Sequence, residues 1–214
     1  MAGGLARRMG GGDKGMREVG GQTVLARVLA RLGPQVSRVI INANGDPARL
    51  ASFGLPIVPD SVADHPGPLA GVLAGLDWAA DAGIEWVVSA PGDAPFLPTD
   101  LVARLHAARG DAAMTLAASG ARTHPVVALW PVSMREKLRD ALTAGLRKVG
   151  AFTEGAAVAT WPAEPVDPFF NVNTPEDLAA ADRLAATLSP SPGGLTRPPP
   201  PRAGAARRTP PDPA

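Results

Sequence analysis

The apolar positions of this chain fall into short runs that alternate with helically spaced stretches. Residues 36–42 (VSRVIIN) and 85–90 (EWVVSA) are compact apolar runs that end in polar or turn residues. Such runs are typical of strands that are buried on both faces of a parallel sheet. Residues 113–117 and 125–130 have the same character. We predict one strand from each of these four segments.

Helical patterns occupy the sequence between and around these runs. Thr23 opens an amphipathic stretch that stops at Gly33, and Thr174 followed by Pro175 is typical of an N-cap with proline in the first turn. The predicted helices cover residues 23–32, 69–80, 101–108, 131–142 and 175–188. Alternation of this kind indicates an α/β fold with a mostly parallel, doubly wound sheet of Rossmann-like type. We expect a single domain over residues 1–188.

The chain begins inside a glycine-rich loop, because Met1 and Ala2 are followed directly by Gly3 and Gly4. In doubly wound folds such a loop follows the first strand, which lies centrally in the sheet. A gap there would leave main-chain groups of both neighbouring strands unpaired. We therefore expect that the first strand is missing from this chain and that its start is truncated.

Composition narrows the classes of function. The chain has no cysteine, which excludes disulfides, thiolate zinc sites and thiol catalysis. No apolar run is long enough to span a bilayer, and the N-terminus lacks the apolar region of a secretory signal peptide. These features lead us to expect a cytoplasmic protein with no membrane partner.

Charge is unevenly distributed along the chain. The net charge of +1 depends on residues 190–214, which hold nine proline, four arginine and one aspartate residue and leave the body with a net charge of −2. A nucleic-acid-binding protein usually has a basic body, so we expect no nucleic acid partner. Residues 189–214 are too poor in apolar side chains to fold. We expect them to form a disordered or polyproline-like Pro/Arg-rich tail.

Residues 1–15 (MAGGLARRMGGGDKG) match two familiar phosphate-loop patterns poorly. The Walker pattern needs Ser or Thr after its lysine, but Lys14 is followed by Gly15. The G-x-G-x-x-G pattern that begins at Gly10 has no strand before it. Neither a Walker loop nor a dinucleotide fingerprint is therefore predicted.

A third interpretation uses the same loop as a whole. Gly3 and Gly4 allow main-chain N–H groups to approach a nucleotide without obstruction from a Cβ atom. Arg7, Arg8 and Lys14 bring three cations onto one short segment. Cations at this density suit a triphosphate, so the loop predicts a nucleotide site.

This loop resembles the signature L-x-G-G-x-x-x-R-M-G-x-x-K of nucleotidyltransferases that activate sugars and pterin cofactors. Within that superfamily the sequence is similar to the molybdenum cofactor guanylyltransferases. Met1 stands where the family has leucine, and the Pro/Arg-rich tail is not part of the family's pattern. The resemblance extends over residues 1–187 through further blocks in the family's order: Asn42-Ala-Asn44, Asp60-Ser61, Pro66 to Gly71, Pro91 to Pro95, His124-Pro125 and Asn171 to Pro175.

The resemblance implies a nucleotidyltransferase that transfers GMP from GTP to the terminal phosphate of molybdenum-molybdopterin and releases pyrophosphate. It implies Mg²⁺ as cofactor, held by Asp93, which follows a predicted strand at the sheet edge where ligands bind in open α/β folds. The implied catalytic residues are Lys14, Arg8 and Asp93. The implied GTP-binding residues are Met1, Ala2, Gly3, Gly4, Lys14, Asn42, Asp60 and Asp93. The implied pterin-binding residues are His124, Asn171 and Asn173, with Arg122 nearby.

Several alternatives stay open at this point. A related enzyme would use CTP on the same pterin, and sugar-phosphate nucleotidyltransferases share the glycine loop, the lysine and the aspartate. A non-catalytic nucleotide-binding or cofactor-delivery module is a different class. Asn42 and Asp60 would also suit Asx turns at strand ends, and His124 would suit a purely structural hydrogen bond. Molybdoenzymes or their chaperones are the acceptors expected for the product.

Overall fold

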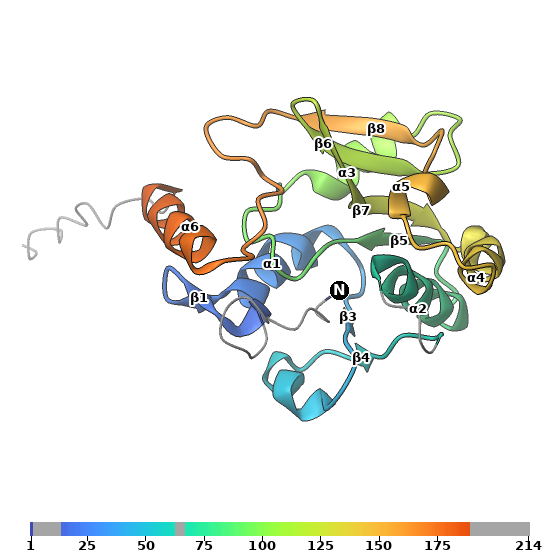
Figure 1. The fold of residues 1–214 in the computed structure, drawn as a ribbon, viewed down its shortest axis with the longest axis horizontal. Helices are drawn as coiled ribbons and strands as arrows, with labels where there is room; N and C mark the ends of the chain where they lie inside the picture. The colour runs from blue at the N-terminus through green and yellow to red at the C-terminus, as the bar shows by residue number, and fades with distance from the viewer. Residues whose placement is uncertain (2–13, 63–66, 189–214) are drawn as a thin grey trace, which may run out of the picture.

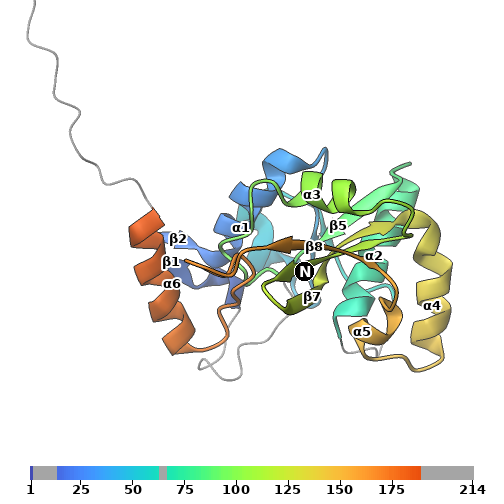
Figure 2. The same ribbon diagram turned by 90° about the horizontal axis from the view of Figure 1, so that it is seen from above.

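A computed structural model describes Met1, residues 14–62 and residues 67–188. Its main sheet consists of β5 Trp86–Ser89, β6 Thr115–Ser119, β7 Arg122–Pro131 and β8 Ala157–Trp161. The helices are α1 Val24–Leu32, α2 Pro68–Asp81, α3 Leu101–Ala108, α4 Arg135–Thr143, α5 Val149–Phe152 and α6 Pro175–Leu188. Figure 1 shows the arrangement, and Figure 2 shows α1 and α3 on one side of the main sheet and α2, α4 and α5 on the other. This layering confirms the predicted α/β class.

The main sheet has the strand order β5-β7-β6-β8. β7 pairs antiparallel with both β5 and β6, whereas β6 and β8 are parallel. Strands β5, β6 and β8 therefore share one direction, and β7 alone runs against them. A two-residue turn, Gly120 and Ala121, joins β6 to β7, and Gly120 has a positive φ of 54°. So short a connection permits only an antiparallel pair.

Smaller elements lie outside the main sheet. β3 Ile41–Asn42 pairs in parallel with β4 Ile57–Val58, and β1 Glu18–Val19 forms a hairpin with β2 Gln22–Thr23. The short 3-10 helices are Lys14–Met16, Gly33–Gln35, Pro47–Phe53 and Val132–Met134. Within the residues that the structure describes, no helix has the length and apolar character needed to cross a bilayer.

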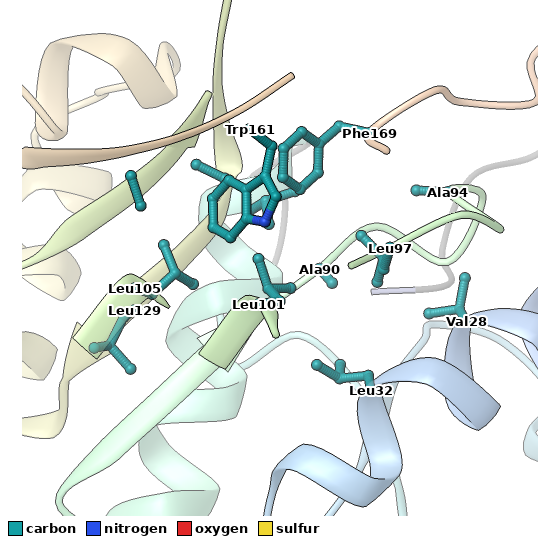
Figure 3. Packing of buried hydrophobic residues seen from close by; sticks show 13 residues of the cluster. Val28, Leu32, Ala90, Ala94, Leu97, Leu101, Leu105, Leu129, Trp161 and Phe169 are labelled. Atoms are coloured by element: carbon teal, nitrogen blue, oxygen red, sulfur yellow. The ribbon is translucent and has the colours of Figure 1, made fainter. Parts of the chain in front are cut away.

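The two faces of the main sheet bury two separate apolar clusters. Val127 and Leu129 of β7 face α1 and α3, while the intervening Ala128 and Trp130 face α2 and α4. Figure 3 shows the first cluster, in which Trp161 lies edge-on to the Phe169 ring at a centroid distance of 5.4 Å. Successive residues of β7 thus contribute side chains to both clusters in turn, as expected of a strand that is covered on both faces.

The β3–β4 pair is not joined to the main sheet, because β3 and β5 do not pair. Met1 lies between these two elements (Figure 1), where its amino group donates to the Ala90 carbonyl at 2.9 Å and its carbonyl accepts from the Gly92 N–H at 2.8 Å. Burial lowers the pKa of that amino group to about 6. A cavity of about 90 Å³ beside Met1 is bounded by α1, α2, β5 and residues 39–41.

Most predicted elements occur in the structure within a few residues of their expected ends. The segment 36–42 is the exception, because only Ile41 and Asn42 form a ladder, and they do so with β4. Residues 36–40 pair with no strand in the described part of the chain. A strand needs a partner for its main-chain groups, and an apolar sequence alone does not supply one. β8 and the small β1–β2 hairpin were not predicted.

Candidate functional site

A cavity of about 670 Å³ lies at the carboxyl end of β5. That volume is within the range of small-molecule sites. Its walls come from Met1, the 3-10 helix at Lys14, the ends of β3 and β4, the start of α2, the loop after β5, and β7. The charged and polar side chains that line it are Lys14, Asn42, Asn44, Asp60, Asp93, Arg122, Thr123, His124 and Asn171.

Two asparagines hold the Asp60 carboxylate on one side of this cavity. The Asn42 amide donates to Asp60 Oδ1 at 2.9 Å, and the Asn44 amide donates to Oδ2 at 2.8 Å. The Asp60 main-chain N–H donates back to Asn44 Oδ1 at 2.9 Å. Because β3 and β4 are parallel neighbours, the residues at their carboxyl ends come together. The result is an acidic group with a fixed orientation.

Gly71, in the first turn of α2, packs directly against this group. A Cβ atom at position 71 would collide with Asn42 Oδ1 and would lie 3.0 Å from the Met1 sulfur atom. Position 71 therefore needs glycine because Asn42 and Met1 lie too close for a side chain. The backbone conformation is not the reason, since any residue can adopt the helical conformation found here. The first turn of α2 and the end of β3 thereby share one wall of the cavity.

Asp93 follows β5 and is half-buried at the cavity wall. Burial raises the pKa of its carboxyl group, and the positive charge of Lys14 acts in the opposite direction. The Asp93 carbonyl accepts a hydrogen bond from the Val172 N–H at 2.9 Å. That bond ties the loop after β5 to the segment that carries Asn171 and Asn173.

Lys14 is held by the segment that precedes α6. Its Nζ donates to Asn173 Oδ1 at 2.8 Å. Asp177 Oδ2 in turn accepts from the main-chain N–H groups of Asn173 and Thr174, and Thr174 Oγ1 accepts from the Asp177 N–H at 3.1 Å. This reciprocal pattern is a capping box at the start of α6. The helix cap therefore fixes the asparagine that orients the lysine.

His124 and Asn171 form a further part of the cavity wall. The buried His124 ring lies 4.7 Å from the Phe169 ring, centroid to centroid, and burial lowers the pKa of the imidazole. Asn171 Oδ1 is buried and has no hydrogen-bond partner within the residues that the structure describes. Buried acceptors without partners are unfavourable, so this oxygen is suited to a donor from a bound molecule.

Only part of the site predicted from sequence can be placed. Ala2, Gly3, Gly4 and Arg8 lie outside the described residues. Met1, Lys14, Asn42, Asp60, Asp93, His124 and Asn171 all line the same cavity. Asn173 is not in the lining and contacts Lys14 instead.

Sequence reasoning missed three residues of this region as site components. Asn44 was noted only as part of a motif, although it holds the second oxygen of Asp60. Phe169 lines the cavity beside His124, and Ser119 contacts the same imidazole from behind. The Phe-Phe pair just before Asn171 was the available signal for Phe169. No signal in the sequence pointed to Ser119.

The side chains beside the cavity include possible ligands for Mg²⁺. Among the described residues, no three histidine, aspartate or glutamate side chains cluster in a way that could hold a metal ion by themselves. Mg²⁺ usually takes one or two carboxylates and completes its shell with water and substrate phosphates. A single half-buried carboxylate beside a cavity, as at Asp93, fits that mode of binding.

Known proteins with similar sequences carry a consistent name. The molybdenum cofactor guanylyltransferase of Nitrobacter hamburgensis is 58% identical over 193 residues, which cover 87% of this chain and 92% of the relative. The molybdenum cofactor guanylyltransferase of Cereibacter sphaeroides is 50% identical over 187 residues, covering 86% of this chain and 94% of the relative.

Solved structures extend the likeness to the fold. Molybdopterin-guanine dinucleotide biosynthesis protein A from Archaeoglobus fulgidus superposes with a TM-score of 0.69 at 23% identity and covers 87% of this chain and 97% of its own. The 4-diphosphocytidyl-2C-methyl-D-erythritol synthase of Anaerococcus prevotii has a TM-score of 0.64 at 15% identity, covering 81% and 92%. The model of the MobA-like NTP transferase domain matches residues 1–160. On this match and on the identity of its relatives, the chain belongs to the family of MobA-like NTP transferase domains.

Proposed function

We propose that this chain transfers GMP from GTP to the terminal phosphate of molybdenum-molybdopterin and releases pyrophosphate. The relatives at 50–58% identity are named for this activity. The main support for the proposal is that one cavity is lined by three groups of residues. These are Asp60 with its two asparagines, the neighbouring charges of Lys14 and Asp93, and the pair His124 and Asn171. These three parts suit a base, a chain of phosphates and a second substrate.

Asp60 is the group that we assign to the nucleotide base. The Watson–Crick edge of guanine presents two adjacent N–H donors, and a carboxylate can accept both at once. Asn42 and Asn44 already donate to the two Asp60 oxygens and fix the plane of the carboxylate. Cytosine presents one N–H donor at this edge, its 4-amino group, beside the N3 and O2 acceptors, so a carboxylate could accept only one hydrogen bond from it and would face the N3 lone pair. The preference for GTP over CTP follows from this difference.

Lys14 and Asp93 are the groups that we assign to the phosphates. Lys14 would neutralise charge on the β- and γ-phosphates as pyrophosphate leaves, with Arg8 as a second cation predicted from the sequence. Asp93 would hold Mg²⁺, which when bound supplies positive charge to phosphate oxygens. Catalysis of this type rests on positioning and electrostatic stabilisation.

His124, Asn171 and Arg122 are the groups that we assign to the pterin substrate. An oxygen of its terminal phosphate would attack the α-phosphorus in line and form the new P–O bond. The bond between the α-phosphorus and its bridging oxygen would break, and pyrophosphate would leave with the electron pair. The attacking phosphate is already anionic near neutral pH. The protein therefore needs no nucleophile of its own and little general-base chemistry.

Two further assignments belong to the same proposal. Because the proposed reaction consumes GTP, we assign the chain to the cytoplasm. Molybdoenzymes or their chaperones would accept the finished dinucleotide. Both remain predictions, as do the contact of Asn173 with the pterin and the roles of Ala2, Gly3 and Gly4.

Replacing Gly71 with alanine should weaken GTP binding about tenfold, the effect of losing one hydrogen bond to a charged group. The added Cβ atom would displace the Asn42 amide and release one oxygen of Asp60. Gly75→Ala is a matched control in the same helix, because its Cβ atom would meet only Val87 at an ordinary 3.7 Å. Isothermal titration with GTP and Mg²⁺ measures both variants. Equal affinity in the two variants would contradict the role of the Asn42–Asp60 contact.

Nucleotide selection tests the proposed function directly. The full chain is incubated with molybdenum-molybdopterin, Mg²⁺ and either GTP, CTP or ATP, and pyrophosphate release is followed. We expect release with GTP and at most a few per cent of that rate with CTP or ATP. A higher rate with CTP would assign the chain to cytidylyl transfer, and GTP binding with no release under any condition would favour a non-catalytic nucleotide-binding module.

A further inference from the structure

A buried serine lies behind the imidazole at the cavity wall. Ser119 Oγ is 2.7 Å from His124 Nε2, and only 3% of Ser119 is exposed. In the β6–β7 ladder Ala117 is opposite His124 and Ser119 is opposite Arg122. Ser119 and His124 are therefore diagonal neighbours on one face of the hairpin. The short Gly120 turn holds this register.

The proton positions of the pair follow from the surrounding groups. The hydroxyl of Ser119 has one hydrogen, and within the described residues His124 Nε2 is its only side-chain partner. If Nε2 carried the proton and donated it to Ser119, the buried hydroxyl hydrogen would have no acceptor, which is unfavourable. Ser89 is another buried serine, and its hydroxyl is fully hydrogen-bonded: it donates to the Val126 carbonyl and accepts from Trp130 Nε1.

The charge of the imidazole is set by its surroundings. Burial lowers the pKa of His124, while Asp167 raises it and Arg122 lowers it further. The ring is therefore neutral near pH 7 and carries one proton. With Ser119 donating to Nε2, that proton lies on Nδ1. His124 lines the cavity and Ser119 does not, so the serine acts from the side away from the ligand.

We propose that Ser119 is a positioning residue that locks neutral His124 in the Nδ1–H tautomer, so that the imidazole donates a hydrogen bond to an acceptor atom of the bound substrate. The identity of that substrate as the pterin rests on the proposed function above. A neutral donor binds a phosphate or carbonyl oxygen and adds no charge to the site. Asn171 Oδ1 on the same wall supplies the complementary acceptor. Together they would recognise a ligand that presents both a donor and an acceptor.

The tautomer is measured first, without any activity assay. Long-range ¹H–¹⁵N correlation spectra of the full chain report which nitrogen of each histidine is protonated. The chain has three histidines, and His65→Gln and His106→Gln variants assign the His124 signals. We expect Nδ1–H in the wild type at pH 7.5. An Nε2–H or doubly protonated ring would overturn the proposal, and this result needs no variant of Ser119.

Ser119 variants then test the effect on the substrate. In Ser119→Ala the tautomer preference should be lost, and KM for molybdopterin should rise about tenfold while KM for GTP and kcat stay within about twofold. Ser119→Thr keeps the hydroxyl and should restore both the spectrum and KM. An unchanged His124 spectrum in Ser119→Ala would overturn the proposal. If the wild type shows the Nδ1–H tautomer but no guanylyl transfer, the proposed function fails while the role of Ser119 stands.

Discussion

Replacing Asp93 with asparagine is expected to reduce kcat/KM for guanylyl transfer by about 100- to 1,000-fold, the usual effect of removing one group that stabilises transition-state charge. Asparagine keeps the size of the side chain and removes its negative charge. The carboxyl group is half-buried beside the cavity, where its charge is less screened than in bulk water, and burial raises its pKa. Loss of that charge would weaken Mg²⁺ binding most of all.

Steady-state rates over a series of Mg²⁺ concentrations measure this effect. Asp81→Asn removes the same charge from an exposed position at the end of α2 and should leave the rates unchanged. Activity of Asp93→Asn should recover in part at high Mg²⁺ concentration, since substrate phosphates supply further ligands. A variant with normal kcat/KM and normal Mg²⁺ dependence would remove Asp93 from the proposed metal site.

Replacing Lys14 with alanine is expected to lower kcat by about 100-fold or more, because the lysine would act on charge that develops as pyrophosphate leaves. The lysine is held in place by Asn173, which is itself held by the capping box of α6. Asn173→Ala should therefore show a smaller loss, about tenfold, since the cation remains but is less well oriented.

Single-turnover rates with saturating GTP separate this effect from binding. Lys148→Ala removes the same charge from an exposed position that precedes α5, and its rate should equal that of the wild type. Lys14→Ala and Asn173→Ala should not be additive, because both act through the same contact. If the two losses were fully additive, Asn173 would act independently of Lys14. That result would favour the predicted role of Asn173 in pterin binding.

The sequence predicts the layers of this fold better than its strand pairing. Alternation of apolar runs and helical patterns is enough to place α2, β5 and α3, since each is an apolar or helically spaced segment that can be recognised by itself. The direction of β7 depends on the two-residue turn at Gly120, and the ladder of residues 36–42 depends on the presence of a partner strand. These features are properties of pairs of segments, which periodicity within one segment does not report.

The candidate site was also predicted only in part: some of its residues were identified from the sequence, but the contacts that orient them were not. Asp93 was predicted from its position after a buried strand, at the sheet edge where ligands bind in open α/β folds, and Asp60 was predicted from the family resemblance. The contacts that orient them come from distant parts of the chain: Asn173 is 159 positions from Lys14, and Val172 bonds to the Asp93 carbonyl. Ser119 is an ordinary strand residue in the sequence, and only the hairpin register brings it to His124.

Labelled GTP shows whether this chain forms the dinucleotide. The full chain is incubated with molybdenum-molybdopterin, Mg²⁺ and GTP labelled at its α-phosphate, and the products are separated and identified by mass spectrometry. The proposed function predicts a molybdopterin guanine dinucleotide that carries the label, formed together with an equal amount of pyrophosphate. Binding of GTP without formation of a labelled dinucleotide, or release of the label as free GMP, would contradict it.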